Sequence, residues 1–172
     1  AFSSISPKKN GGHKMLNTFI QTQTKKPYCT DNFDWGIKPR PLKTAIKNRY
    51  IQANGPTHHH WLCFDIDRAG AAYDWEDRGL PAPNITVTNP KNRHAHLLYS
   101  LKTSVRTAPF ANARPLYYLA ALEAAMTKKL GADRGFSGLM IKNPLNDHWI
   151  TQVLHNEMYD MGELSEYVIL KT

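Results

Sequence analysis

Two aspartates near the end of an apolar run are the first residues of this sequence that could do chemistry. The run Trp-Leu-Cys-Phe-Asp-Ile-Asp spans residues 61–67 and places Asp65 and Asp67 two positions apart. Alternate side chains of a strand share a face, so a strand here would align both carboxylates. Such a pair repels unless a cation lies between the two charges, and hard divalent ions prefer carboxylate oxygens. The pair therefore indicates a metal site, although acids at a strand end that simply reach water give the same pattern.

Two histidines follow with the same spacing. His94 and His96 open the segment 94–101, in which Ala95 and every second residue after it are apolar. A strand would place both imidazoles on one face and the apolar residues on the other. Lys91 and Arg93 lie in the turn just before. A neutral imidazole can donate to a phosphate or ligate a metal, and the basic turn can hold further negative charge.

A third acid is expected if metal ions are to be clamped around a triphosphate. Asp133 follows the long apolar-striped segment 113–130 and precedes an extended one, which predicts a place at the sheet edge. Asp147 competes with it, but lies in Asn-Asp-His, a pattern typical of an ordinary turn. Lys142 ends an apolar run and is either a phosphate contact or a surface lysine with a buried stem.

The composition points to a polyanionic partner. The chain has 172 residues, with 22 Lys and Arg against 14 Asp and Glu, for a net charge of +8. Such a balance favours nucleic acid or an anionic membrane surface. No stretch approaches the ~20 apolar residues of a membrane span, and the two cysteines are too few for a disulfide framework. We therefore expect a cytoplasmic protein that binds nucleic acid and has no membrane partner.

The hydrophobic pattern predicts an α+β fold. We expect helices over 13–26, 42–53, 113–130 and 161–170, strands over 61–67, 84–88, 94–101 and 149–154, and an extended segment over 136–141. Residues 1–12 are expected to be frayed and 27–41 to form a loop. Elements in this order favour helices packed on one face of a largely antiparallel sheet. We divide the chain into an N-terminal extension, flexible and then helical, over 1–26 and one catalytic domain over 27–172.

The same residues resemble known motifs. Phe64-Asp65-Ile66-Asp67 resembles the first motif of the archaeo-eukaryotic primase superfamily, Arg93-His94-Ala95-His96-Leu97 its second and Asp133 its third. The longer strings at 82–87, 94–99, 131–133 and 142–144, with Trp149, are similar to the Rep replication initiators of small colicin-type theta plasmids, the replicase family. This resemblance covers about residues 27–149.

The resemblance implies a primase catalytic domain with an RNA-recognition-motif-like sheet. It implies metal-dependent synthesis of a short primer from NTPs on a single-stranded DNA template at a plasmid origin. A host DNA polymerase in the bacterial cytoplasm would then extend the primer. Asp65, Asp67 and Asp133 would bind Mg²⁺ or Mn²⁺, and His96 would contact the nucleotide phosphates, supported by Lys142, Arg93 and His94. The family's C-terminal origin-binding region is not expected within these 172 residues.

Two other functions fit parts of the pattern. His94-Ala95-His96 also matches the two-histidine motif of HUH single-strand nickases, in which a tyrosine on a helix attacks the phosphodiester, and Tyr117 or Tyr118 would be the candidate. That assignment leaves Asp65 and Asp67 without an essential role. A non-catalytic nucleic-acid-binding module would use only the basic charge.

Overall fold

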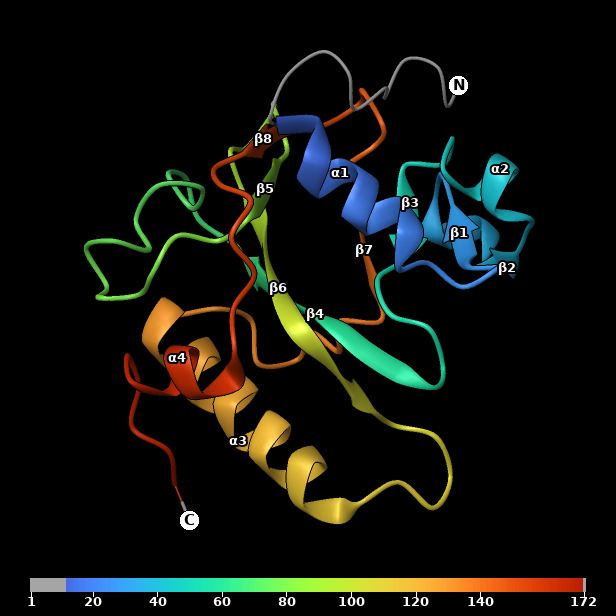
Figure 1. Ribbon diagram of the computed structural model, residues 1–172. Helices are drawn as coiled ribbons and strands as arrows, with labels where there is room; N and C mark the ends of the chain where they lie inside the picture. The colour runs from blue at the N-terminus through green and yellow to red at the C-terminus, as the bar shows by residue number, and fades with distance from the viewer. Residues whose placement is uncertain (1–11, 172) are drawn as a thin grey trace.

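The computed structural model describes residues 12–171, which form both helices and strands (Figure 1). The helices are α1 (Gly12–Gln21), α2 (Leu42–Ala45), α3 (Ala113–Leu130) and α4 (Met161–Ser165), with a 3₁₀ helix, η2 (Phe33–Trp35). The fraying expected over residues 1–12 falls outside the described part of the chain except at Gly12, which begins α1. None of the described helices is long and apolar enough to cross a membrane.

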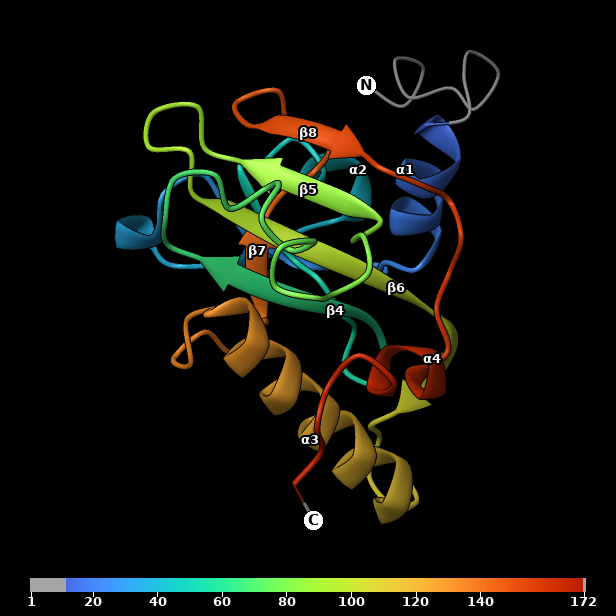
Figure 2. The ribbon, with the colours of Figure 1, turned by 90° about the vertical axis from the view of Figure 1, so that its left-hand side faces the viewer.

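The central sheet has four antiparallel strands in the order β4-β6-β5-β8 (Figure 2). They are β4 (His58–Ile66), β5 (Ile85–Thr88), β6 (Ala95–Arg106) and β8 (Ile150–Val153). The strands that the sequence predicts over 84–88 and 94–101 correspond to β5 and β6, which pair as a hairpin. In the β4–β6 ladder, Asp65 lies opposite His96, so the first predicted motif directly faces the second.

The two faces of this sheet bury different side chains, as the alternation predicts. Alternate residues of β4 and β6 on one face pack under α3 and α4; they include Leu62, Phe64, Leu97 and Tyr99. The apolar stripe of α3 lies in the same core, and Figure 1 shows both helices on this side of the sheet. The residues between them, such as Trp61, Cys63 and Leu98, pack on the other face.

A second, smaller sheet and α1 cover that other face. Its antiparallel strands run in the order β2-β1-β3-β7, with β1 (Tyr28–Thr30), β2 (Lys38–Pro39), β3 (Tyr50–Gln52) and β7 (Met140–Lys142). Ile51, Ile141 and Phe19 pack with Trp61 in this core. The central sheet is therefore covered on both faces, by two helices on one and by a helix with a small sheet on the other.

Four local predictions were wrong. The helix expected over 42–53 ends at Ala45, and the residues from Tyr50 form a strand, because β3 pairs with both β1 and β7 and buries Ile51 completely. The loop expected over 27–41 contains β1, η2 and β2, and the extended segment begins only at Met140. The closing helix stops at Ser165, after which the carbonyl of Tyr167 accepts a hydrogen bond from Lys129 Nζ.

Candidate functional site

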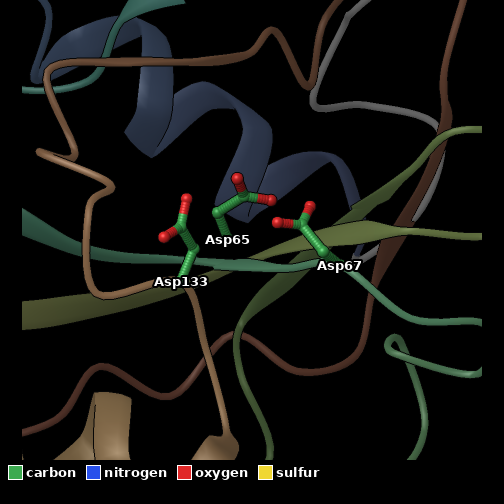
Figure 3. Close-up of side chains that lie close together, drawn as sticks. All are labelled: Asp65, Asp67 and Asp133. Carbon is green, nitrogen blue, oxygen red and sulfur yellow. The ribbon is translucent and has the colours of Figure 1, made fainter.

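Three carboxylates meet at one end of β4. Asp65 is the penultimate residue of that strand, Asp67 follows its last residue, and Asp133 follows α3. Their side chains point toward one another (Figure 3), and one oxygen from each lies within 4.8 Å of the others. Within residues 12–171 no other group of at least three His, Cys, Asp or Glu side chains meets this distance. The structure thus joins the two acids of the first motif to the acid predicted from a distant segment.

The end of α3 brings Asp133 to the strand acids. Gly131 ends the helix in the left-handed region, with φ 63°, and its N–H donates back to the carbonyls of Lys128 and Thr127. The chain then turns toward the sheet, where the Asp133 N–H donates to the Asp65 carbonyl at 2.8 Å. A glycine suits this position because it adopts positive φ without steric cost.

Arg68 connects the same helix end to the segment that follows β4. Its Nη2 donates to the Leu130 carbonyl at 2.7 Å and its Nη1 to the Gly131 carbonyl at 3.3 Å. Asp74 holds the guanidinium by accepting from Nε at 2.7 Å and Nη2 at 2.9 Å. The last carbonyls of a helix lack partners within the helix, so Arg68 satisfies them. Arg68 was not among the residues predicted from the sequence, where its position directly after Asp67 was the available signal.

His96 is buried behind Asp65 in a defined tautomer. Its Nδ1 accepts the Lys142 backbone N–H at 3.0 Å, so in the neutral ring the proton is on Nε2. Nε2 lies 3.3 Å from Asp65 Oδ1. Burial lowers the pKa of His96, and the contact with Asp65 offsets only part of this effect. His96 is therefore a neutral imidazole at pH 7 that carries its proton on Nε2, the ring nitrogen beside Asp65.

Asp65 has a buried oxygen that lacks a hydrogen bond. Oδ1 accepts no hydrogen bond from any described residue, although His96 Nε2 lies 3.3 Å away. Burial raises the pKa of Asp65, but His96 and Lys142 outweigh it and the net pKa is lowered. A buried, ionised oxygen without a donor is costly, and a hard divalent cation would satisfy it. The three acids therefore fit such an ion.

A cavity of about 450 Å³ opens beside the acids. Asp65, Asp133, His96 and Lys142 line it together with aromatic residues. Lys142 is almost fully buried and its Nζ lies 5.6 Å from the centre of the Trp149 ring. Burial lowers the pKa of Lys142, while the charges of Asp65 and Asp67 oppose that shift. Of the two alternatives for Lys142, the surface lysine is thus wrong, and Lys142 can present its ammonium to an anion in the cavity.

The other candidate residues lie at the rim or elsewhere. His94 Nδ1 is 3.6 Å from Asp67 Oδ1, beside the exposed Asp67. Arg93 is exposed in the turn before β6, with φ 64°, and does not line the cavity. Asp147 is exposed in the turn before β8 and is not part of the acid group. Of the two competing third acids, the structure brings Asp133 to the pair.

The tyrosines of the nickase alternative lie on the wrong side of the sheet. Tyr117 and Tyr118 belong to α3, which covers the face formed by Leu97 and its alternate neighbours. His96 projects from the opposite face of β6, toward β7. The sheet therefore separates the tyrosines from the imidazole, which argues against a nucleophilic tyrosine acting at this site.

Comparison with known proteins agrees with this geometry. The model of the Replicase family matches residues 22–168. Among solved structures, the AEP domain of the cyanophage S-2L primase-polymerase (PrimPol) is similar, with a TM-score of 0.63 and 14% sequence identity. The alignment covers 90% of this chain and 95% of that domain. No curated protein matches the chain. At this identity the likeness concerns the fold, and it confirms the primase-like α+β core expected from the sequence.

Proposed function

The chain belongs to the Replicase family, and from this premise we propose that it is a primase that synthesises a short primer from NTPs on a single-stranded DNA template. The observation that carries the proposal is the gathering of Asp65, Asp67 and Asp133 around one point, beside a cavity that contains His96 and Lys142. Acids and phosphate-binding groups in one cavity suit transfer of a nucleotidyl group, which depends mainly on positioning and charge stabilisation.

Each residue has a role in this proposal. Asp65, Asp67 and Asp133 hold Mg²⁺ or Mn²⁺, and the buried, unpartnered Oδ1 of Asp65 supports that role. A divalent ion held by these acids would lower the pKa of the primer 3′-hydroxyl and neutralise charge on the leaving pyrophosphate. His96 offers its Nε2–H to a phosphate oxygen.

Lys142 supplies a positive charge within the cavity, and Arg93, in the turn before β6, and His94, beside Asp67, offer further phosphate contacts. The net charge of +8 supports binding of the template backbone. We further propose that residues 27–172 form the catalytic unit of a bacterial, cytoplasmic plasmid initiator whose primers a host DNA polymerase extends.

A primer-synthesis assay tests the proposal. The purified chain is incubated with labelled NTPs, single-stranded DNA and either Mg²⁺, Mn²⁺ or a chelator. We expect oligonucleotides only when a divalent ion is present. The double variant Asp65→Ala/Asp67→Ala should make none while keeping its circular dichroism spectrum. Asp147→Ala is the matched control, because that acid is exposed and apart from the group.

Three outcomes would contradict the proposal. Primer synthesis by the double variant would show that Asp65 and Asp67 are not the acids of the catalytic site. A covalent protein–DNA adduct lost in Tyr117→Phe or Tyr118→Phe would favour the nickase. Binding of nucleic acid without synthesis and without any dependence on metal would favour a non-catalytic module.

A further inference from the structure

An aromatic wall lines the cavity beside the acids. Phe33, from η2, and Tyr50, the first residue of β3, both line it, with ring centroids 4.4 Å apart. Tyr50 also packs edge-on against Trp149, at 5.3 Å between ring centroids. Tyr50 is thus braced on both sides, whereas Phe33 contacts it and remains 49% exposed. A ring in this situation has apolar surface available to a ligand.

The loop that carries Phe33 is tied to the small sheet. The Asp34 N–H donates to Asn32 Oδ1 at 2.9 Å, which caps η2 at its start. At its end, the Gly36 N–H donates to the Phe33 carbonyl at 2.9 Å. Asp31 Oδ1 accepts the Arg49 N–H at 2.9 Å, which joins the loop to the residue before Tyr50. Hydrogen bonds thus connect the backbone segments that carry Phe33 and Tyr50, and the two rings lie together without a ligand.

The neighbouring Trp35 shows that exposure alone does not define the wall. It belongs to the same 3₁₀ helix and is 71% exposed, but it does not line the cavity. Phe136, which also lines the cavity, packs against His96, with ring centroids 5.0 Å apart. Phe33 is the aromatic residue in this cavity with about half of its surface open.

The cavity thus has two chemically different parts. The acids, with the metal proposed for them, and Lys142 suit a polyphosphate. The Phe33–Tyr50 wall has no charge and suits a flat, weakly polar ring. We propose that this wall stacks on the base of the incoming nucleoside triphosphate, an inference that rests on the proposed function. Every base has a π-face, so stacking positions the nucleotide without selecting among bases, as template-directed synthesis requires.

Binding without a template tests the inference separately from catalysis. Isothermal titration calorimetry with Mg²⁺ compares ATP, GTP and inorganic tripolyphosphate, which has the charge but no base. We expect the wild-type chain to bind both nucleotides more tightly than tripolyphosphate. Phe33→Leu should weaken both nucleotides about tenfold and leave tripolyphosphate unchanged. Phe33→Tyr should restore nucleotide affinity, and Trp35→Leu is the matched control that should change nothing.

The outcomes separate the two proposals. If Phe33→Leu binds ATP as tightly as the wild type, the stacking wall is wrong and the proposed function stands. If it weakens tripolyphosphate as much as ATP, Phe33 acts on the phosphate part and the inference is also overturned. If the wild type binds neither ATP nor tripolyphosphate, the nucleotide site itself is absent and both proposals fail.

Discussion

Asp65 and Asp133 reach the same point by different structural routes. Asp65 lies on β4, which pairs with β6 along its length, and it is placed directly opposite His96 in that ladder. Asp133 lies in the connection after α3, where its own N–H makes one hydrogen bond to the sheet, at the Asp65 carbonyl. Asp65 is therefore positioned by the regular pairing of β4 with β6, and Asp133 by the turn of the chain at the end of α3.

The strand acids and Asp133 therefore depend on different parts of the fold. Strand alternation places Asp65 and Asp67 on one face whatever covers the sheet. Asp133 needs the apolar stripe of α3 to pack on the opposite face, Gly131 to turn the chain and Arg68 to hold the helix end. Four substitutions can test this contrast.

Asp65→Asn should have the largest effect. It removes a carboxylate charge at the buried position whose oxygen lacks a hydrogen-bond donor. We expect primer synthesis to fall about a thousandfold or more, because an acid that holds the metal supports several kcal/mol of charge stabilisation. Mn²⁺ binding measured by electron paramagnetic resonance should fall with it. Unchanged Mn²⁺ affinity would show that Asp65 is not a ligand.

Asp133→Asn should reduce activity less, by about a hundredfold, because this acid is exposed and the strand pair remains. The same Mn²⁺ titration and the primer assay measure it, with Asp147→Asn as the control. If Asp147→Asn reduced primer synthesis and Mn²⁺ affinity as much as Asp133→Asn, Asp133 would not be the third acid and Asp147 would return as a candidate.

Arg68→Ala tests the attachment of the helix end without touching any acid. Loss of its bonds to the Leu130 and Gly131 carbonyls should let Asp133 move, weakening Mn²⁺ binding about tenfold. Arg68→Lys should restore part of that affinity. Arg78→Ala is the comparison, because Arg78 contacts the same Asp74 at 3.6 Å without any hydrogen bond to the helix end. A lower melting temperature with normal Mn²⁺ affinity would leave Arg68 a purely structural role.

Glu123→Gln should have the smallest effect on the site and act on stability alone. Glu123 is half-buried on α3, and burial raises its pKa to about 7. The folded state therefore holds this proton more tightly than the unfolded chain, whose Glu titrates near 4.3. The stability that the protonated Glu123 contributes is complete below about pH 4.3 and is lost as the pH rises through about 7.

Thermal unfolding at several pH values measures this effect. From pH 5 to 8 the wild type should lose about 2–3 kcal/mol of stability relative to Glu123→Gln, and Mn²⁺ affinity at pH 8 should match between the two. A pH-independent difference in stability would show that Glu123 does not titrate in this range.

Much of the central sheet could be predicted from residue types alone. The alternation over 61–67 and 94–101 assigned each side chain to the face where it lies, since neighbouring side chains in a strand point to opposite faces. The stripe of α3 and its end at Gly131 followed from helical spacing and from the freedom of glycine. The small sheet could not be predicted in this way. Tyr50 and Ala53 continue the helical spacing of the residues in α2, but Tyr50 belongs to β3, and the pairing of β3 with two distant strands overrides that spacing.

By itself, then, the sequence determined which acids and histidines share a face of the sheet, because strand periodicity is local. Only the tertiary structure decided that Asp133 rather than Asp147 joins them, because that depends on where a helix docks. It also decided the tautomer of His96, through a backbone N–H from β7, and the place of Phe33 beside the acids. These features join segments far apart in the chain, so no local pattern could specify them.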